Sequence, residues 1–285
     1  MTIPNSSQKK ILIISGKGNH SWFLSSLIIK RIVESISGFR AYMDFSYCFS
    51  RNRMRYTPKF HNYDAIIMNY NGPNWSRKTE RDLEKYISEG GGMILFHSAS
   101  NSFPNWVAFN HMIGFGGWNG RDEKSGPRFH YQNNDLIYDN SPGIAGYHGN
   151  IHDFIVKTKD PSHPIMDGLP KEWLHSKDEL YENLRGPGKN MTILASAESD
   201  PKYGGLGQEV PVVAVLEYGC GKIFHTTMGH CKMISLSNAM LCIGFQELMA
   251  RGIKWVIGDN SLSPIPKNHP TKLKTSTKNW RSILK

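Results

Sequence analysis

The sequence contains no long apolar segment and few cysteines. Its longest apolar runs, such as Ile11 to Ile14 and Met93 to Phe96, are far shorter than the ~18 residues that a membrane-spanning helix needs. The first ten residues have no apolar stretch behind their lysines, so no secretion signal is predicted. None of the four cysteines has the C-x-x-C spacing of a zinc ribbon. We therefore expect a cytoplasmic protein without a membrane partner.

The motifs of common nucleic-acid-binding proteins are also missing, although the formal net charge is +10. Six Lys or Arg and no acidic residue lie between Asn260 and the C-terminus, and removing these six charges leaves +4. We therefore expect residues 259–285 to form a basic tail that is extended or disordered, and we expect no nucleic-acid partner. Residues 1–9 are expected to be disordered. The 39% hydrophobic content suits one packed domain over residues 10–258.

The hydrophobic pattern predicts alternating strands and helices. Residues Lys10 to Ser15 form a β-branched apolar run, and apolar residues recur at helical spacing from Ser21 to Ser37. Ser76 is expected to cap a helix that Gly90 ends. Further strands are predicted at Phe39–Phe45, Ala65–Asn69, Met93–Phe96, Phe154–Thr158, Met191–Ala197, Pro211–Tyr218 and Lys222–Thr227. This order is typical of an α/β protein with a mainly parallel sheet.

The remaining segments are predicted with less regular structure. Residues Ser50 to Lys59 are polar and are expected to form a loop. From Phe103 to Asp153 no clear period is present, and a loop-rich stretch of this length is more often functional than decorative. A single helix is predicted from Ser237 to Ile257, with one apolar stripe facing the sheet.

Three glycines, Gly90 to Gly92, precede a buried strand that delivers His97 to a turn of small residues. In open α/β sheets, ligands bind beyond the carboxyl ends of the strands, so His97 is the first candidate for chemistry. The turn resembles a nucleophile elbow, but the G-x-S-x-G surround of a catalytic serine is absent around Ser98. A histidine that only binds a carbonyl group and packs is the alternative.

Other polar residues are expected near the same edge of the sheet. His20 follows the first strand in a short glycine-containing turn, and His230 follows the last strand, whereas His225 within that strand is expected to be structural. The segment Trp173 to Tyr181 combines an imidazole with two carboxylates, which suits acid–base catalysis or metal binding, and an exposed polar loop is the alternative. His148 and His152 have i, i+4 spacing, but the intervening glycine disfavours a zinc-binding helix.

Aromatic rings alternate with amides in the loop-rich stretch, where Trp118 lies among Asn101, Asn110 and Asn119. Flat rings that cover sugar faces and amides that bind hydroxyl groups favour a carbohydrate site. A packed surface loop remains the alternative.

The chain resembles the ThuA-like, trehalose-utilisation family from about Lys10 to Ile257. The motifs that carry the resemblance are Asn69-Tyr70-Asn71-Gly72, Gly90-Gly91-Gly92, His97-Ser98-Ala99, Met112-Ile113-Gly114, His163-Pro164-Ile165, Gly168-Leu169-Pro170, Trp173, Asp178-Glu179-Leu180-Tyr181, Gly186-Pro187 and His225-Thr226-Thr227-Met228-Gly229-His230. The resemblance implies a flavodoxin-like three-layer sandwich of the class I glutamine amidotransferase-like type. It also implies that glutaminase activity is absent, because the elbow lacks the cysteine nucleophile.

The family implies a role in the use of trehalose and related disaccharides. We expect an enzyme that acts on a disaccharide or a 3-keto-glycoside by histidine-based acid–base chemistry, and a divalent metal ion on His20, His97 and His230 is one option. The alternative is a non-catalytic sugar-binding or regulatory module. A homodimer would suit this fold. The predicted catalytic residues are His20, His97, Asp178, Glu179 and His230, and the predicted substrate-binding residues are Asn71, Ser98, Asn101, Trp118, His175 and Tyr181.

Overall fold

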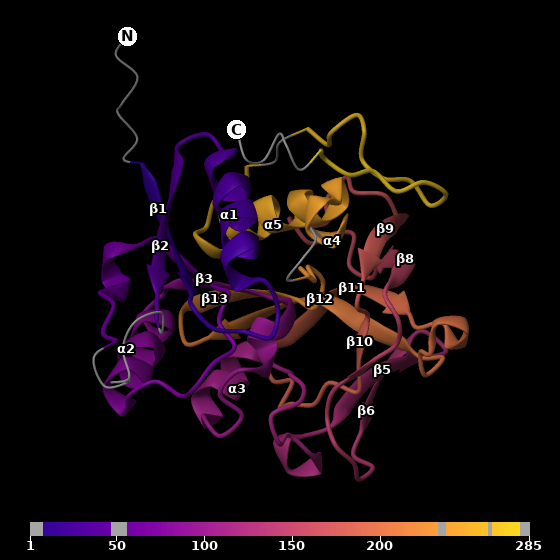
Figure 1. The fold of residues 1–285 in the computed structure, drawn as a ribbon, viewed down its shortest axis with the longest axis horizontal. Coiled ribbons are helices and arrows are strands. Elements are labelled where there is room, and N and C mark those ends of the chain that lie inside the picture. Colours follow the sequence, from indigo (N-terminus) through magenta and orange to yellow (C-terminus); the bar gives the residue numbers. More distant parts are fainter. Residues whose placement is uncertain (1–7, 47–55, 233–237, 262–263, 280–285) are drawn as a thin grey trace.

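A computed structural model of the protein describes residues 8–46, 56–232, 238–261 and 264–279 (Figure 1). The described α-helices are α1 (Trp22–Glu34), α2 (Arg77–Ser88), α3 (Val107–Ile113), α4 (Asn238–Leu241) and α5 (Ile243–Val256). The first seven strands are β1 (Lys9–Ser15), β2 (Phe39–Phe45), β3 (Ala65–Met68), β4 (Gly92–Phe96), β5 (Arg128–Gln132), β6 (Asp135–Asp139) and β7 (Tyr147–His148). The others are β8 (His152–Thr158), β9 (Glu172–Asp178), β10 (Tyr181–Glu182), β11 (Met191–Glu198), β12 (Glu209–Tyr218) and β13 (Gly221–Thr226).

One 11-stranded sheet runs through the described part of the molecule in the order β2-β1-β3-β4-β13-β12-β11-β8-β9, and the β5–β6 hairpin branches from β12. The strands from β2 to β13 along this path pair in parallel. Those from β13 to β9 pair antiparallel. The chain therefore has a mixed α/β fold in which a parallel half continues into an antiparallel half.

Helices cover both faces of the parallel half. Helices α1, α4 and α5 lie on one face, and α2 and α3 lie on the other (Figure 1). Alternate residues of β1 enter the two cores, since Ile11 and Ile13 pack with the first group of helices and Leu12 and Ile14 with the second. Buried apolar side chains on both faces explain why the parallel strands appear in the sequence as short continuous apolar runs.

Several local predictions are confirmed. The Ser76 hydroxyl oxygen accepts a hydrogen bond from the Thr79 backbone N–H at 3.2 Å and so caps α2. Gly90, with φ of 112°, follows the end of that helix. The long helix predicted from Ser237 to Ile257 is wrong in one respect, because Cys242 has an extended ψ of 126° and separates α4 from α5. Residue 237 and the first part of the predicted Ser50–Lys59 loop lie outside the described residues.

The stretch from Phe103 to Asp153 contains more regular structure than predicted. Helix α3, the β5–β6 hairpin and β7 lie within it. The segment Trp173 to Tyr181, for which an exposed loop was an alternative, belongs mostly to β9 and β10. These strands are short or contain several polar residues, so neither a continuous apolar run nor a clear helical period marks them in the sequence.

The described part of the C-terminal tail, residues 264–279, has no helix or strand but lies against the domain. The Leu174 N–H donates to the Thr271 carbonyl oxygen at 2.9 Å, and the Ile243 N–H donates to that of Ser276 at 2.9 Å. The tail is therefore extended and bound along β9 and the start of α5. Among all described helices, none has both the length and the apolar character required to cross a membrane.

Candidate active site

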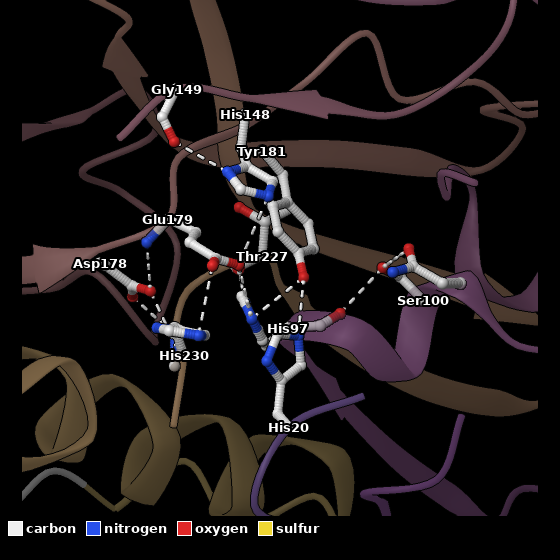
Figure 2. Close-up of polar contacts among 12 residues, drawn as sticks. His20, His97, Ser100, His148, Gly149, Asp178, Glu179, Tyr181, Thr227 and His230 are labelled. Carbon is white, nitrogen blue, oxygen red and sulfur yellow. Dashed lines mark hydrogen bonds and ion pairs between the residues drawn. The ribbon is translucent and has the colours of Figure 1, made fainter. Parts of the chain in front are cut away.

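Four side chains from separate parts of the sequence converge beyond the carboxyl ends of the parallel strands (Figure 2). His20 follows β1, His97 follows β4, His230 follows β13, and Glu179 lies between β9 and β10. Their potential ligand atoms all lie within 4.8 Å of one another. The parallel half of the sheet supplies the three imidazoles, and the antiparallel half supplies the carboxylate.

The Glu179 carboxylate bridges two of the histidines. Its Oε2 lies 3.5 Å from His97 Nε2, and its Oε1 lies 3.3 Å from His230 Nε2. The Tyr181 hydroxyl is 3.0 Å from His97 Nε2 and 3.5 Å from His20 Nε2. One carboxylate and one phenol are therefore shared among three imidazoles.

The backbone and the second ring nitrogen of His97 fix its orientation. Its backbone φ of 47° lies in the left-handed region. Residues other than glycine seldom adopt this conformation, and it recurs at functional sites. Its Nδ1 is 3.0 Å from the Thr227 carbonyl oxygen. Because a carbonyl oxygen only accepts hydrogen bonds, Nδ1 carries a proton, and Nε2 faces Glu179 and Tyr181.

Asp178 is completely buried and organises the site from behind. Its Oδ1 accepts hydrogen bonds from the backbone N–H groups of Glu179 at 2.8 Å and His230 at 3.0 Å. Its Oδ2 lies 2.8 Å from His175 Nε2 and accepts from the Gly229 N–H at 2.7 Å. Although burial opposes the charged form, the His175 hydrogen bond and charge lower the pKa of Asp178. Asp178 therefore holds two members of the cluster in place.

A cavity of about 390 Å³ opens in front of the cluster. Its lining residues are Asn19, His20, Asn71, Asn101, Trp118, Asn119, His148, Glu179 and Tyr181. Four amides and two aromatic rings thus surround the exposed side of His20 and Glu179. The predicted substrate-binding residues Asn71, Asn101, Trp118 and Tyr181 are all present in this wall.

The loop that carries Trp118 and Asn119 is held by a buried guanidinium group. Arg121 is 2% exposed and donates to the carbonyl oxygens of Asn101 at 2.9 Å and Ser102 at 2.7 Å. It also donates to that of Gly117 at 3.1 Å. These bonds connect the turn after β4 with the loop that forms the cavity wall.

Burial keeps the cluster in a defined protonation state. Burial, assisted by the charges of His97 and His230, lowers the pKa of His20 to about 3. Burial also lowers the pKa of His230. Burial and the nearby charges of Glu179 and Asp178 raise the pKa of Tyr181 well above its ordinary value. At neutral pH, His20 and His230 therefore offer lone pairs, and Tyr181 keeps its proton.

Two predicted substrate-binding residues do not line the cavity. His175 is 0% exposed, and its Nε2 lies 2.8 Å from Asp178 Oδ2 behind the cluster. Ser98 follows His97 in the turn but is not among the lining residues.

Asp178, predicted as catalytic, is buried behind the cluster and has no exposed surface for a substrate. His225 is buried as expected, with Nδ1 2.8 Å from the Ile113 carbonyl oxygen.

Three other cavity residues, Asn19, Asn119 and His148, were not among the predicted site residues. His148 Nε2 lies 3.9 Å from Glu179 Oε2. Its i, i+4 neighbour His152 lines a different cavity of about 700 Å³, where its ring stacks on Tyr203 at 4.3 Å. The two histidines therefore do not act as a pair. The alternation of amides and rings in the sequence had already indicated Asn119 as a possible sugar contact.

The fold and the site define an open-sheet α/β protein with a histidine–carboxylate cluster at the carboxyl edge of its parallel strands. The chain belongs to the ThuA family, whose model, described as trehalose utilisation, matches residues 10–256. A ThuA-like protein from Parabacteroides merdae ATCC 43184 is 36% identical, with 95% of this chain and 98% of that chain covered and a TM-score of 0.91. A ThuA-like protein from Bacteroides uniformis ATCC 8492 is 17% identical over 96% of this chain and 99% of that chain, and its TM-score of 0.56 reflects the shared fold. A search of the curated proteins gave no match.

Proposed function

We propose that this protein is an enzyme of carbohydrate catabolism that acts on a 3-keto-glycoside of the trehalose type by proton transfer. The observation that carries the proposal is the cluster of three imidazoles and Glu179, of which His20 and Glu179, together with Tyr181, line one amide-lined cavity. The family description, trehalose utilisation, supports the substrate class.

The chemistry follows from the acidity of a keto sugar. A ketone acidifies the C–H bonds next to it, so a base that removes such a proton leaves the electron pair on the ketone oxygen as an enolate. His97 Nε2, which faces Glu179 and Tyr181, is the proposed base. The Tyr181 hydroxyl, 3.0 Å from that nitrogen, is a hydrogen-bond donor for the enolate oxygen. Collapse of the enolate then expels the glycosidic oxygen or returns the proton to another carbon.

The cavity wall suits a sugar. Asn71, Asn101 and Asn119 offer amide donors and acceptors for hydroxyl groups, and Trp118 offers a flat ring. The Asn119 side-chain amide already donates to Asn71 Oδ1 at 3.2 Å and to the Asn101 carbonyl oxygen at 2.6 Å. The amides therefore form a connected group in which sugar hydroxyls would replace some of these bonds.

We also propose that the α/β fold is of the flavodoxin-like type. The parallel strands follow the order β2-β1-β3-β4-β13, which corresponds to the flavodoxin-like order 2-1-3-4-5. In that order ligands bind between the first and third strands, where their connections diverge. His20 after β1 and Asn71 after β3 come from the two sides of this point. The position supports a class I glutamine amidotransferase-like framework that uses histidine in place of cysteine.

Incubation with 3-keto-trehalose, followed by NMR of the products, tests this function. We expect the wild-type protein to convert the sugar and the His97→Ala variant to lose at least ~100-fold in rate, since a positioned base contributes about that much. His61→Ala serves as the control, because His61 is exposed and does not line the cavity.

The competing function, a sugar-binding module without turnover, gives a different result in the same experiment. Calorimetry would then detect binding of the keto sugar, while NMR would detect no conversion by the wild-type protein. That combination would contradict the proposed reaction and support the binding module.

A further inference from the structure

We infer that His20, His97, His230 and Glu179 form a binding site for one divalent transition-metal ion of the zinc type. This inference goes beyond the proposed reaction, because it concerns a ligand that is bound without any sugar. Three imidazole nitrogens and one carboxylate oxygen are a ligand set that such ions prefer.

The distances suit a tetrahedral ion. Ligands about 2.0–2.2 Å from zinc are roughly 3.4 Å apart in a tetrahedral site. Two distances between the imidazoles and the Glu179 carboxylate are already close to this length, one to each carboxylate oxygen: His230 Nε2 to Oε1 at 3.3 Å and His97 Nε2 to Oε2 at 3.5 Å. Since the four potential ligand atoms lie within 4.8 Å of one another, no edge has to shorten by more than about 1.4 Å to match a tetrahedral ion.

Hydrogen bonds to Thr227 and Asp178 orient the proposed ligands, as second-layer groups do in metal sites. The Nδ1–H of His97 donates to the Thr227 carbonyl oxygen, which leaves Nε2 free for the ion. Asp178 Oδ1 accepts the backbone N–H groups of both Glu179 and His230. Three of the four ligands thus have their position or tautomer fixed by a buried hydrogen bond.

The site also has a closed side and an open side. His97 and His230 are 2% and 4% exposed, whereas His20 and Glu179 line the cavity of about 390 Å³. An ion among these ligands would be reached from the cavity, and water or a sugar oxygen could complete its coordination. A metal site with an accessible position is typical of catalysis, whereas structural sites are closed.

The nearby groups argue against a softer metal. None of the described cysteines belongs to the cluster, so a site for Cu(I) or an iron–sulfur cluster lacks its thiolate ligands. Tyr181, whose hydroxyl is 3.0 Å from His97 Nε2, is positioned to bind a ligand of the ion. An ion held by His20, His97, His230 and Glu179 would supply Lewis-acid polarisation of a ketone oxygen that reached it from the cavity.

Calorimetry with an untagged protein tests the site. After treatment with EDTA and dialysis, we expect the wild-type chain to bind about one Zn²⁺ per chain. Glu179→Gln and His97→Ala should each weaken binding at least ~100-fold, because loss of even an outer-shell partner costs 10–100-fold. With Co²⁺, the wild-type protein should develop the visible absorption of a low-symmetry site, and both variants should lose it.

His148→Gln is the matched control, because His148 lies 3.9 Å from Glu179 on the cavity wall but outside the proposed ligand set. Its Zn²⁺ affinity should stay within about threefold of the wild type. Absence of stoichiometric binding by the folded wild-type protein would overturn the inference, and so would unchanged affinity in both ligand variants. Zinc bound by a protein that leaves 3-keto-trehalose intact would contradict only the proposed reaction.

Discussion

At the scale of single residues, His97 is the proposed base and also has an unfavourable backbone conformation. A φ of 47° costs a residue with a Cβ atom about 1 kcal/mol relative to glycine. The sequence predicted the strand, the turn after it and the position of His97 in that turn. Nothing in the sequence indicated that Asp178 faces inward while Glu179 faces the cavity, because this depends on how β9 ends against the β13 turn.

The strain at His97 leads to a prediction about stability. His97→Gly and His97→Ala both remove the imidazole, so they lose the same contacts. We expect the glycine variant to be more stable than the alanine variant by about 1 kcal/mol in urea unfolding, because only alanine keeps the strained Cβ. An alanine variant as stable as the glycine variant would show that the turn relaxes once the imidazole is absent.

His225 gives a pH-dependent prediction. Burial lowers its pKa in the folded protein to about 4, from 6.5 in the unfolded chain. The unfolded chain therefore binds a proton more readily below pH 6.5, and stability is lost as the pH falls from 6.5 towards 4. The expected loss between pH 8 and pH 5 is about 2 kcal/mol.

Urea midpoints of the wild type and His225→Gln, measured at both pH values, isolate this contribution. Glutamine keeps a side-chain donor for the Ile113 carbonyl oxygen but does not titrate. The variant should lose about 2 kcal/mol less than the wild type over this pH range. Equal losses in the two proteins would mean that His225 does not remain neutral in the folded state.

At the scale of elements, the two halves of the sheet differed in how well they could be predicted. The parallel strands β1, β3 and β4 are buried on both faces, so each contains a continuous apolar run. Strand β6 is short, and its residues are exposed or half-buried. Strand β9 is partly polar. Their pairing depends on distant partners, and local sequence patterns do not contain that information.

The loop that forms the cavity wall depends on Arg121. Arg121→Lys keeps the charge but has fewer donors for the carbonyl oxygens of Asn101, Ser102 and Gly117. We expect this variant to raise the KM for the keto sugar at least ~10-fold, because Trp118 and Asn119 lose their support.

Arg128→Lys is the control for this change. Arg128 forms an ion pair with Asp139 in the β5–β6 hairpin, and both side chains are 24% exposed. Such a pair contributes little, so KM should stay within about twofold of the wild type. An Arg121→Lys variant with wild-type KM would show that the loop is held by other contacts.

At the scale of the whole molecule, the C-terminal tail contributes to the fold. Residues 259–285 were expected to be extended or disordered, but the composition of a basic segment does not indicate whether a sheet edge binds it. The His269 ring lies 5.7 Å from that of Trp173, which is 0% exposed. The Lys272 ammonium group also contacts Glu172 at 2.6 Å.

Removal of residues 260–285 should therefore lower Tm by at least ~4 °C, since it uncovers Trp173 and removes several backbone hydrogen bonds. Lys272→Ala is the control, because it removes only the exposed ion pair with Glu172 and should shift Tm by less than about 1 °C. Thermal unfolding followed by circular dichroism measures both. An unchanged Tm after truncation would mean that the tail contributes nothing to stability.

Proton transfer at the cluster is tested most directly by NMR of 3-keto-trehalose in D₂O. We predict that the wild-type protein removes or exchanges the protons next to the keto group at least ~100-fold faster than His97→Ala and Glu179→Gln do. The proposed function would be contradicted if, with the wild-type protein, these protons were removed or exchanged no faster than in a sample without protein.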